Sequence, residues 1–353
     1  MRDVDLLALT AALVDIASPS LDETVFADHV ERRLRAVPWL TVERVGDNVV
    51  ARTELGRDQR LLLVGHLDTV PANGNEVARI EGDTLWGLGS ADMKSGLAVF
   101  LELAESVDAP AVDVTYVFYA AEEIAAEHSG LLELYRERPG LLEGDAAILG
   151  EPTDGWLEAG CQGTVRVVLT FRGARAHTAR PWMGRNAIHR LGAAIARIDG
   201  FEARSPVIDG CEYREAMQAV FVDGGVAGNV VPDEASLTVN LRVAPDRTVD
   251  EALEGLRDVL GDTLETDDRF VVVDSASPAP PSLTHPLFAR LIADGAPVRA
   301  KLGWTDVARF AEHDMPAVNF GPGDATVAHT ADEHVHRESI GRVYDALLAL
   351  LTA

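Results

Sequence analysis

Apolar and polar residues follow two different patterns along the chain. In roughly the first 150 residues, short apolar runs rich in β-branched and aromatic residues alternate with longer segments of helical periodicity. The runs at 60–65, 113–121 and 145–150 predict buried central strands, and the segments at 93–107 and 128–138 predict helices that pack on them. This alternation predicts a doubly wound, mostly parallel sheet of the α/β class.

A second pattern begins near residue 164. Residues 164–173 alternate between apolar and polar side chains, which is typical of a strand with one buried face. The predicted elements that follow have the order β-α-β-β-α-β, as in a ferredoxin-like unit; they lie at 164–173, 184–199, 218–225, 234–243, 248–260 and 269–276. We therefore predict an α/β domain (1–163 and 278–353) with a ferredoxin-like α+β domain (164–277) inserted into it.

Composition and charge limit the possible partners. The chain has 353 residues and a net charge of −26, which disfavours binding to nucleic acid or to an anionic membrane. No apolar run approaches the roughly 20 residues of a membrane span. The N-terminus carries Asp3, Asp5 and Asp15 and lacks the pattern of a signal peptide, so we interpret it as an amphipathic helix and expect a cytoplasmic protein.

One segment inverts this charge. No Asp or Glu occurs between Ala159 and Ile198, and seven arginines lie there: Arg166, Arg172, Arg175, Arg180, Arg185, Arg190 and Arg197. These arginines either balance the charge of acidic residues elsewhere or attract an anionic substrate. We favour the second interpretation.

The residues that follow the predicted strands indicate a metal site. Ligands of an open α/β sheet bind at the carboxyl ends of its strands. These ends carry His66 and Asp68, then Glu122 and Glu123, then Glu151, while Asp92 precedes a helix and His329 follows a late strand. Each residue alone has an ordinary explanation, such as a helix N-cap for Asp92. Their coincidence at one edge of the sheet predicts a divalent-metal site.

The number of candidate ligands favours two metals over one. Five ligands exceed the four of a tetrahedral zinc and suit a pair about 3.5–4 Å apart that shares a carboxylate and a water. A further carboxylate must then take a proton from that water and deliver it to the leaving amine. We therefore expect one residue of the pair Glu122–Glu123 to bind metal and the other to act on the water.

Six motifs carry a resemblance to a known family. The segments "GHLDTVP", "GLGSADMKSG", "AAEE", "LGEPT", "GARAHTARPWMGRNAI" and "GPGDATVAHTADEHV" resemble the M20 family of dinuclear zinc amidohydrolases and peptidases across essentially the whole chain. Within it, "LGEPTDGWLEAGCQGTVRVVL", "IDGCEYREAM", "GGVAGNVVPDEAS" and "GWTDVARF" are similar to the actinobacterial branch of succinyl-diaminopimelate desuccinylases.

The resemblance implies hydrolysis of a small anionic N-acyl amino acid, N-succinyl-LL-2,6-diaminopimelate, with two Zn²⁺ per subunit for which Co²⁺ can substitute. Other activities of the family remain alternatives: acetylornithine deacetylase, aminoacylase and dipeptidase. A non-catalytic metal-binding protein is disfavoured, because it would have no need of Glu122 as a base.

The resemblance also implies roles for the metal ligands. His66 and Glu151 would bind one zinc, Glu123 and His329 the other, and Asp92 would bridge the two. The peptide bond after Asp92 is cis in the family.

Further roles follow from the resemblance. Glu122 would be the general acid/base, and Asp68 would orient His66. The inserted domain would be a lid through which a homodimer forms, with His177 stabilising the oxyanion in the partner's active site. Substrate contacts would come from Asn229 and Arg242 in the lid and from Thr305 in the catalytic domain. A paired arginine of better-known desuccinylases is replaced here by Cys161–Gln162, which leaves the contact to the succinyl carboxylate unassigned.

Overall fold

The computed structural model describes residues 4–353, so Asp3 lies outside it. The chain forms two compact units. The first contains the described residues up to Ala159 together with Ser282–Arg299 and Arg309–Ala353, and the second contains Gly160–Pro281 and Ala300–Ala308. The predicted boundaries differ from these by a few residues, and residues 300–308 were expected in the first unit but belong to the second.

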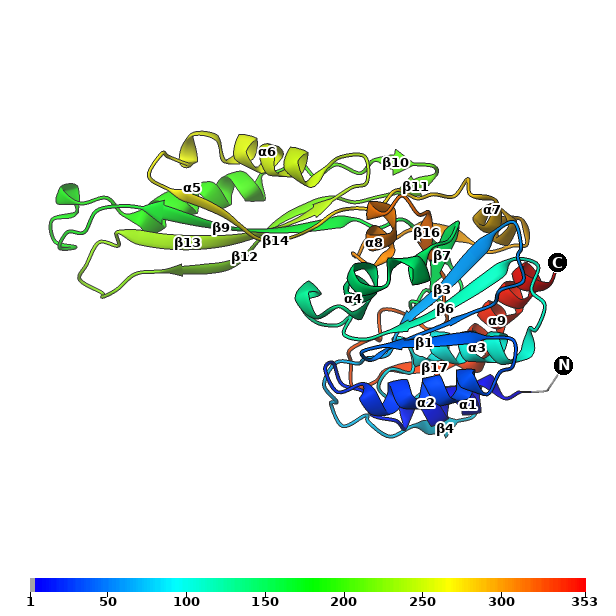
Figure 1. Cartoon of the computed structure of the whole chain (residues 1–353). Helices are drawn as coiled ribbons and strands as arrows, with labels where there is room; N and C mark the ends of the chain where they lie inside the picture. Colours follow the sequence, from blue (N-terminus) through cyan, green and yellow to red (C-terminus); the bar gives the residue numbers. More distant parts are fainter. Residues whose placement is uncertain (1–3) are drawn as a thin grey trace. The chain divides into compact units, whose positions relative to one another are not determined.

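An eight-stranded sheet forms the centre of the first unit (Figure 1). Its order is β1 (Thr41–Val45), β2 (Asn48–Arg52), β6 (Asp113–Tyr119), β3 (Arg60–His66), β7 (Ala146–Leu149), β16 (Ala317–Asn319), β8 (Leu157–Ala159) and β15 (Val298–Ala300). The central strands β6, β3, β7 and β16 pair in parallel. The pairs β1–β2, β2–β6 and β16–β8 are antiparallel. The predicted mostly parallel sheet is thus confirmed at its centre, and the outer strands depart from it.

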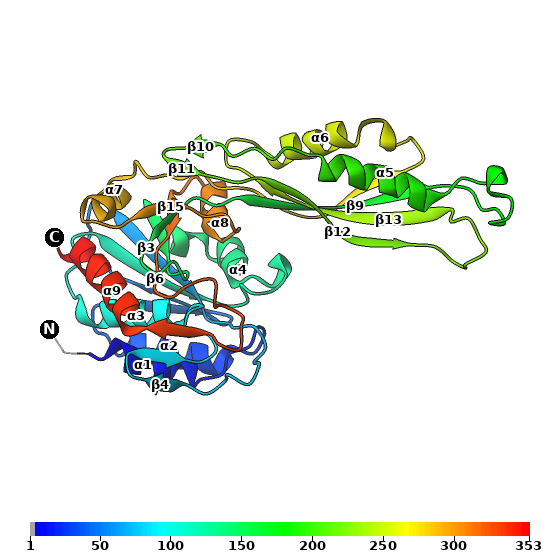
Figure 2. The ribbon, with the colours of Figure 1, turned by 180° about the vertical axis from the view of Figure 1, so that it is seen from behind.

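Helices cover both faces of this sheet, which explains why β3 and β6 are apolar on both sides. Helices α1 (Leu6–Val14), α3 (Lys94–Ser106) and α9 (Arg337–Thr352) pack together on one face, beside α2 (Thr24–Arg35). Helix α4 (Gly130–Glu137) lies on the opposite face (Figures 1 and 2). None of the helices within residues 4–353 is both long and apolar enough to cross a bilayer.

Helix α3 approaches the sheet closely because a glycine faces it. A Cβ atom on Gly65 would come within 2.5 Å of both Leu97 Cδ2 and Met93 Cε. Any larger residue at position 65 would therefore force the side chains of Met93 and Leu97 to move. This contact holds the start of α3, and the Asp92 before it, beside the end of β3.

A small antiparallel sheet was not predicted from the sequence. It joins β17 (His334–His336), β5 (Thr84–Trp86) and β4 (Arg79–Glu81). The pairing of β17 with β5 brings the segment before Asp92 next to the segment after His329, although about 250 residues separate them.

The second unit contains a four-stranded antiparallel sheet with the order β12 (Ala216–Gly224), β13 (Glu234–Val243), β9 (Gly163–Arg172) and β14 (Arg269–Ala276). Helices α5 (Ala187–Asp199) and α6 (Val249–Leu260) pack on the apolar face of the sheet, and α6 begins with a capping box formed by Thr248 and Glu251. Order and connectivity are those of the predicted ferredoxin-like unit.

The arginine-rich segment is mostly neutralised within the second unit. Six of its seven arginines form ion pairs with acidic residues from 233–274: Arg166–Asp274, Arg172–Glu234, Arg175–Asp233, Arg185–Glu265, Arg190–Asp268 and Arg197–Asp262. Arg180 is the member of the group for which the described structure shows no ion pair. The favoured interpretation, attraction of an anionic substrate by the whole cluster, is therefore wrong for most of its members, whose charge is balanced locally.

Arg190 provides a test of this structural role. Its guanidinium makes two 2.7 Å hydrogen bonds to the carboxylate of Asp268, whose side chain is fully buried. Arg190→Ala should destabilise the protein by about 3 kcal/mol, because it leaves a buried carboxylate without its cation. Denaturant unfolding measures this loss. Arg197→Ala on the same helix removes an exposed pair and should have a much smaller effect; equal losses would contradict the assignment.

Candidate dinuclear metal site

Three parallel strands deliver acidic and imidazole side chains to one edge of the central sheet. His66 is the last residue of β3, Glu122 and Glu123 come three and four residues after the end of β6, and Glu151 comes two residues after the end of β7. Asp92 joins them from the turn before α3, and its peptide bond to Met93 is cis, as the family resemblance implied.

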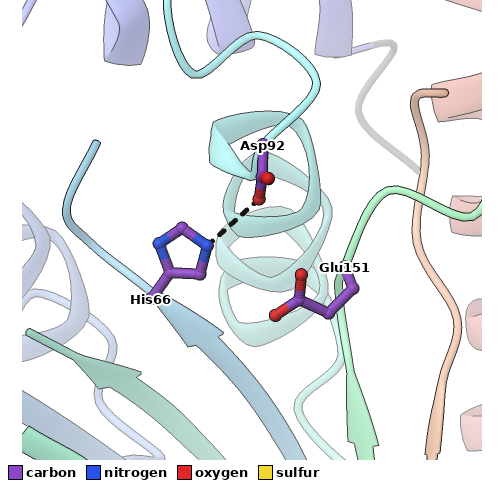
Figure 3. A group of neighbouring side chains, drawn as sticks. All are labelled: His66, Asp92 and Glu151. Atoms are coloured by element: carbon purple, nitrogen blue, oxygen red, sulfur yellow. Dashed lines mark hydrogen bonds and ion pairs between the residues drawn. The ribbon is translucent and has the colours of Figure 1, made fainter. Parts of the chain in front are cut away.

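The first group of potential ligands is His66, Asp92 and Glu151, whose ligand atoms all lie within 4.8 Å of one another. Figure 3 shows the three side chains converging from the end of β3, the start of α3 and the chain after β7. His66 Nε2 lies 3.1 Å from Asp92 Oδ1.

The second group is Asp92, Glu123 and His329, again with ligand atoms within 4.8 Å of one another. His329 Nε2 lies 2.9 Å from Glu123 Oε1 and 3.5 Å from Asp92 Oδ2. Asp92 therefore belongs to both groups and turns one oxygen toward each histidine. This is the arrangement that a carboxylate bridging two metals requires.

Electrostatics favour a cation at this site. The contact with Asp92, together with Glu123, raises the pKa of His329 to about 9 despite partial burial. Burial lowers the pKa of His66, but its bonds to Asp68 and Asp92 outweigh that effect and raise the pKa well above its usual value. Burial and the charge of Asp92 raise the pKa of Glu123. Carboxylates that favour protonated imidazoles in this way would also favour a bound divalent cation.

Asp68 has a broader role than its predicted contact with His66. Its carboxylate accepts hydrogen bonds from the backbone N–H groups of Glu122 (2.9 Å) and Glu123 (3.1 Å) and from the Ser20 hydroxyl (2.8 Å). His66 Nδ1 lies closer to the main-chain oxygen of Asp68, at 3.0 Å, than to its carboxylate, at 3.4 Å. Burial opposes ionisation of Asp68, but its contact with His66 and these donors lower its pKa to about 2. Asp68 thus orients the glutamate pair as well as His66.

Two buried glutamates near the site were not singled out from the sequence. Glu23, 2% exposed, accepts the backbone N–H of Ala121, which has a positive φ of 58° just before Glu122. Glu333, 1% exposed, accepts the backbone N–H groups of Ala91 and Asp92. A glutamate in a polar stretch gives no sequence signal of such burial, because its partners are main-chain groups of distant segments.

The remaining predicted site residues lie in the second unit. His177 and Asn229 are neighbours there: Thr178 N donates to Asn229 O at 3.0 Å, and His177 Nδ1 accepts from Ala179 N at 3.0 Å. Arg242 lies on β13, opposite Thr164 of β9. Thr305 was assigned to the catalytic domain, but it belongs to the second unit, where its main-chain oxygen contacts Cys161 Sγ at 3.7 Å.

The residue that replaces an expected arginine has a structural contact of its own. The side chain of Gln162 donates to Arg214 O at 2.8 Å and accepts from Arg214 N at 3.2 Å. Gln162 is fully buried, so its amide fixes the chain at Arg214 and its carbonyl and amino groups are both used.

Comparisons with known proteins agree with this geometry. Residues 62–353 match the peptidase family M20/M25/M40. The chain is 53% identical to a putative succinyl-diaminopimelate desuccinylase of Mycobacterium tuberculosis, covering 97% of both chains. It is 43% identical to the succinyl-diaminopimelate desuccinylase of Corynebacterium glutamicum, covering 95% of this chain and 93% of the relative.

Solved structures share the fold at low sequence identity. A tripeptidase from Staphylococcus aureus superposes with a TM-score of 0.81 at 21% identity, covering 98% of this chain and 97% of the other. A dinuclear metal-binding peptidase of the M20 family from Bacillus subtilis has a TM-score of 0.71 at 17% identity, covering 98% and 96%. By sequence and fold together, the chain belongs to the M20/M25/M40 family of peptidases.

Proposed function

We propose that the protein is a metal-dependent amidohydrolase that cleaves N-succinyl-LL-2,6-diaminopimelate into succinate and LL-2,6-diaminopimelate, in the cytoplasm. The observation that carries the chemistry is Asp92, which is shared by two ligand groups beside an adjacent glutamate pair. The choice of substrate is supported by the two desuccinylase relatives that align with nearly the whole chain.

The ligand set suits two Zn²⁺ ions, with Co²⁺ as a substitute. His66, Asp92 and Glu151 would hold one ion, and Asp92, Glu123 and His329 the other. Imidazole nitrogens and carboxylate oxygens are ordinary zinc ligands, and the low number of ligands per ion leaves positions open. When bound, the ions supply Lewis acidity, which lowers the pKa of a water molecule and polarises the amide carbonyl.

Glu122 is the residue proposed to move protons. Its backbone is fixed by Asp68, and its carboxylate lies in a group with His66 and Glu123. Held at this edge, the carboxylate takes a proton from the attacking water and later donates it to the leaving amine. Glu123, the next residue, turns toward His329 and serves as a ligand.

The second unit is proposed to bind substrate and to form a homodimer. Asn229, Arg242 and Thr305 would contact the substrate, and a guanidinium such as that of Arg242 suits one of its carboxylates. Edge strand β12 presents Val220, Phe221 and Val222, which are 44%, 72% and 57% exposed. An exposed apolar edge strand favours pairing with a second copy. His177 would then complete the partner's active site by stabilising the oxyanion.

The two adjacent glutamates should respond differently to substitution. Glu122→Ala should retain both metals and lower kcat by about 10²–10⁴-fold, because only the proton shuttle is lost. Glu123→Ala should instead lose metal. Metal analysis of the purified variants together with kcat distinguishes them, and an active Glu122→Ala enzyme would exclude this residue as the base.

A substrate panel tests the specificity. The metal-loaded enzyme should hydrolyse N-succinyl-LL-2,6-diaminopimelate with a kcat/KM at least tenfold above those for N-acetylornithine, other N-acyl amino acids and dipeptides. Chelation should abolish turnover, and Zn²⁺ or Co²⁺ should restore it. A preference for another compound would indicate the corresponding other activity of the family. Inactivity on all compounds would favour a non-catalytic metal-binding protein.

A complementation assay tests the shared active site. His177→Ala and Glu122→Ala homodimers should each be nearly inactive. Random subunit exchange should recover about a quarter of wild-type activity, because half of the dimers are hybrids with one intact site of two. Native mass spectrometry verifies the exchange; hybrids without activity would show that His177 does not act across the dimer.

A further inference from the structure

We infer that Glu333 is a positioning residue that couples two metal-ligand segments, the turn carrying Asp92 and the loop carrying His329. The inference rests on the proposed metal site and deepens it, because it assigns a function to a buried carboxylate that the reaction itself does not use.

Glu333 holds the Asp92 turn at two places. Its Oε1 atom accepts hydrogen bonds from Ala91 N and Asp92 N, both at 3.0 Å. Its main-chain oxygen accepts from Gly87 N, also at 3.0 Å. The same residue therefore fixes the beginning and the end of the segment that presents the bridging carboxylate.

Glu333 also belongs to the His329 loop. Its own N–H donates to Thr330 O at 3.3 Å, which closes the turn that follows His329. Asn75 Nδ2 donates to the same oxygen at 3.1 Å, and Asn75 O accepts from Leu88 N at 2.8 Å. The next residue, His334, pairs with Trp86 in the small sheet. The position of His329 relative to Asp92 thus depends on contacts made by Glu333 and its neighbours.

The surroundings of Glu333 explain why a carboxylate is placed there. It is 1% exposed, and burying an ionised group is costly unless donors or a cation compensate it. Besides the backbone donors, Lys94 interacts with it electrostatically, although burial lowers the pKa of Lys94 to about 7; Lys94 is 2% exposed and donates from Nζ to Ile16 O at 2.7 Å. When ionised, the carboxylate forms charge-assisted hydrogen bonds to the two amides, which are stronger than neutral ones.

The two metal positions should depend on Glu333 unequally. In the group His66, Asp92 and Glu151, two ligands follow β3 and β7 directly and are independent of Glu333. In the group Asp92, Glu123 and His329, two of the three ligands lie on the segments that Glu333 joins. Loss of Glu333 should therefore weaken the second position much more than the first.

The test is Co²⁺ binding to the metal-free full-length protein. Equilibrium dialysis measures the affinity, and visible absorption reports the environment of the bound ion. Glu333→Ala should bind one Co²⁺ with nearly wild-type affinity and the next about 10–100-fold more weakly, with an altered absorption spectrum. Glu333→Gln keeps an acceptor oxygen and should restore most of the affinity. Thermal unfolding of each variant shows that it is folded.

Asp113 supplies a matched control. It is also a buried carboxylate of the first unit, 3% exposed, and accepts two backbone N–H groups, those of Leu55 and Arg57, both at 2.8 Å. It lies at the amino end of β6, whereas the metal ligands lie at the carboxyl ends of the strands. Asp113→Ala should lower stability and leave Co²⁺ binding unchanged.

The inference is overturned if Glu333→Ala binds Co²⁺ like the wild type, or if Asp113→Ala weakens binding equally. Equal weakening of both positions by Glu333→Ala would also contradict it. A wild-type protein that binds only one Co²⁺ would contradict the dinuclear proposal instead; the affinity of that single site in Glu333→Ala and Asp113→Ala would still decide whether Glu333 positions Asp92.

Discussion

The repulsion between carboxylates at the end of the parallel strands is the constraint around which the first unit is organised. Asp68, Asp92, Glu122, Glu123 and Glu151 converge at a place where the imidazoles of His66 and His329 accompany them. Without opposite charge, such a cluster would cost several kcal/mol per buried ion. A pair of divalent cations would satisfy it, and Gly65 lets the start of α3, next to Asp92, pack closely against β3.

A second set of carboxylates fixes the turns that carry the candidate ligands, and it does so through hydrogen bonds to main-chain N–H groups. Asp68, Glu23 and Glu333 are all buried, and each accepts backbone N–H groups from a segment that carries site residues. Because the bonds run to the main chain, the side chains of these segments remain available for metal or proton transfer. Because these turns are already ordered in the folded protein, their conformational entropy is lost during folding and not in each catalytic cycle.

The parts of the structure that depend on local pattern were predictable. Continuous apolar runs identified β3, β6 and β7, and the residues at their ends include three of the five candidate ligands, His66, Glu123 and Glu151, because strand ends of a parallel sheet share one edge. Contacts between distant segments were not: the β17–β5 pairing joins residues 84–86 to 334–336, and the acids that neutralise the arginine-rich segment come from 233–274. The local excess of arginine along the chain gave no sign of these ion pairs. They form because the ferredoxin-like fold brings the two segments side by side.

Selectivity for one amide must come from residues other than the metal ligands. Solved structures with nearly the same fold include a tripeptidase, so neither the fold nor the chemistry of the strand ends distinguishes a peptide from an acylated amino acid. The departures of this chain from the familiar pattern lie elsewhere, at Cys161 and Gln162, and the amide of Gln162 donates one hydrogen bond to the main chain of Arg214 and accepts another from it. Gln162 is buried, uncharged and already bonded to the main chain of Arg214, so it cannot form the ion pair that an arginine would; a cation for the succinyl carboxylate must therefore come from another residue.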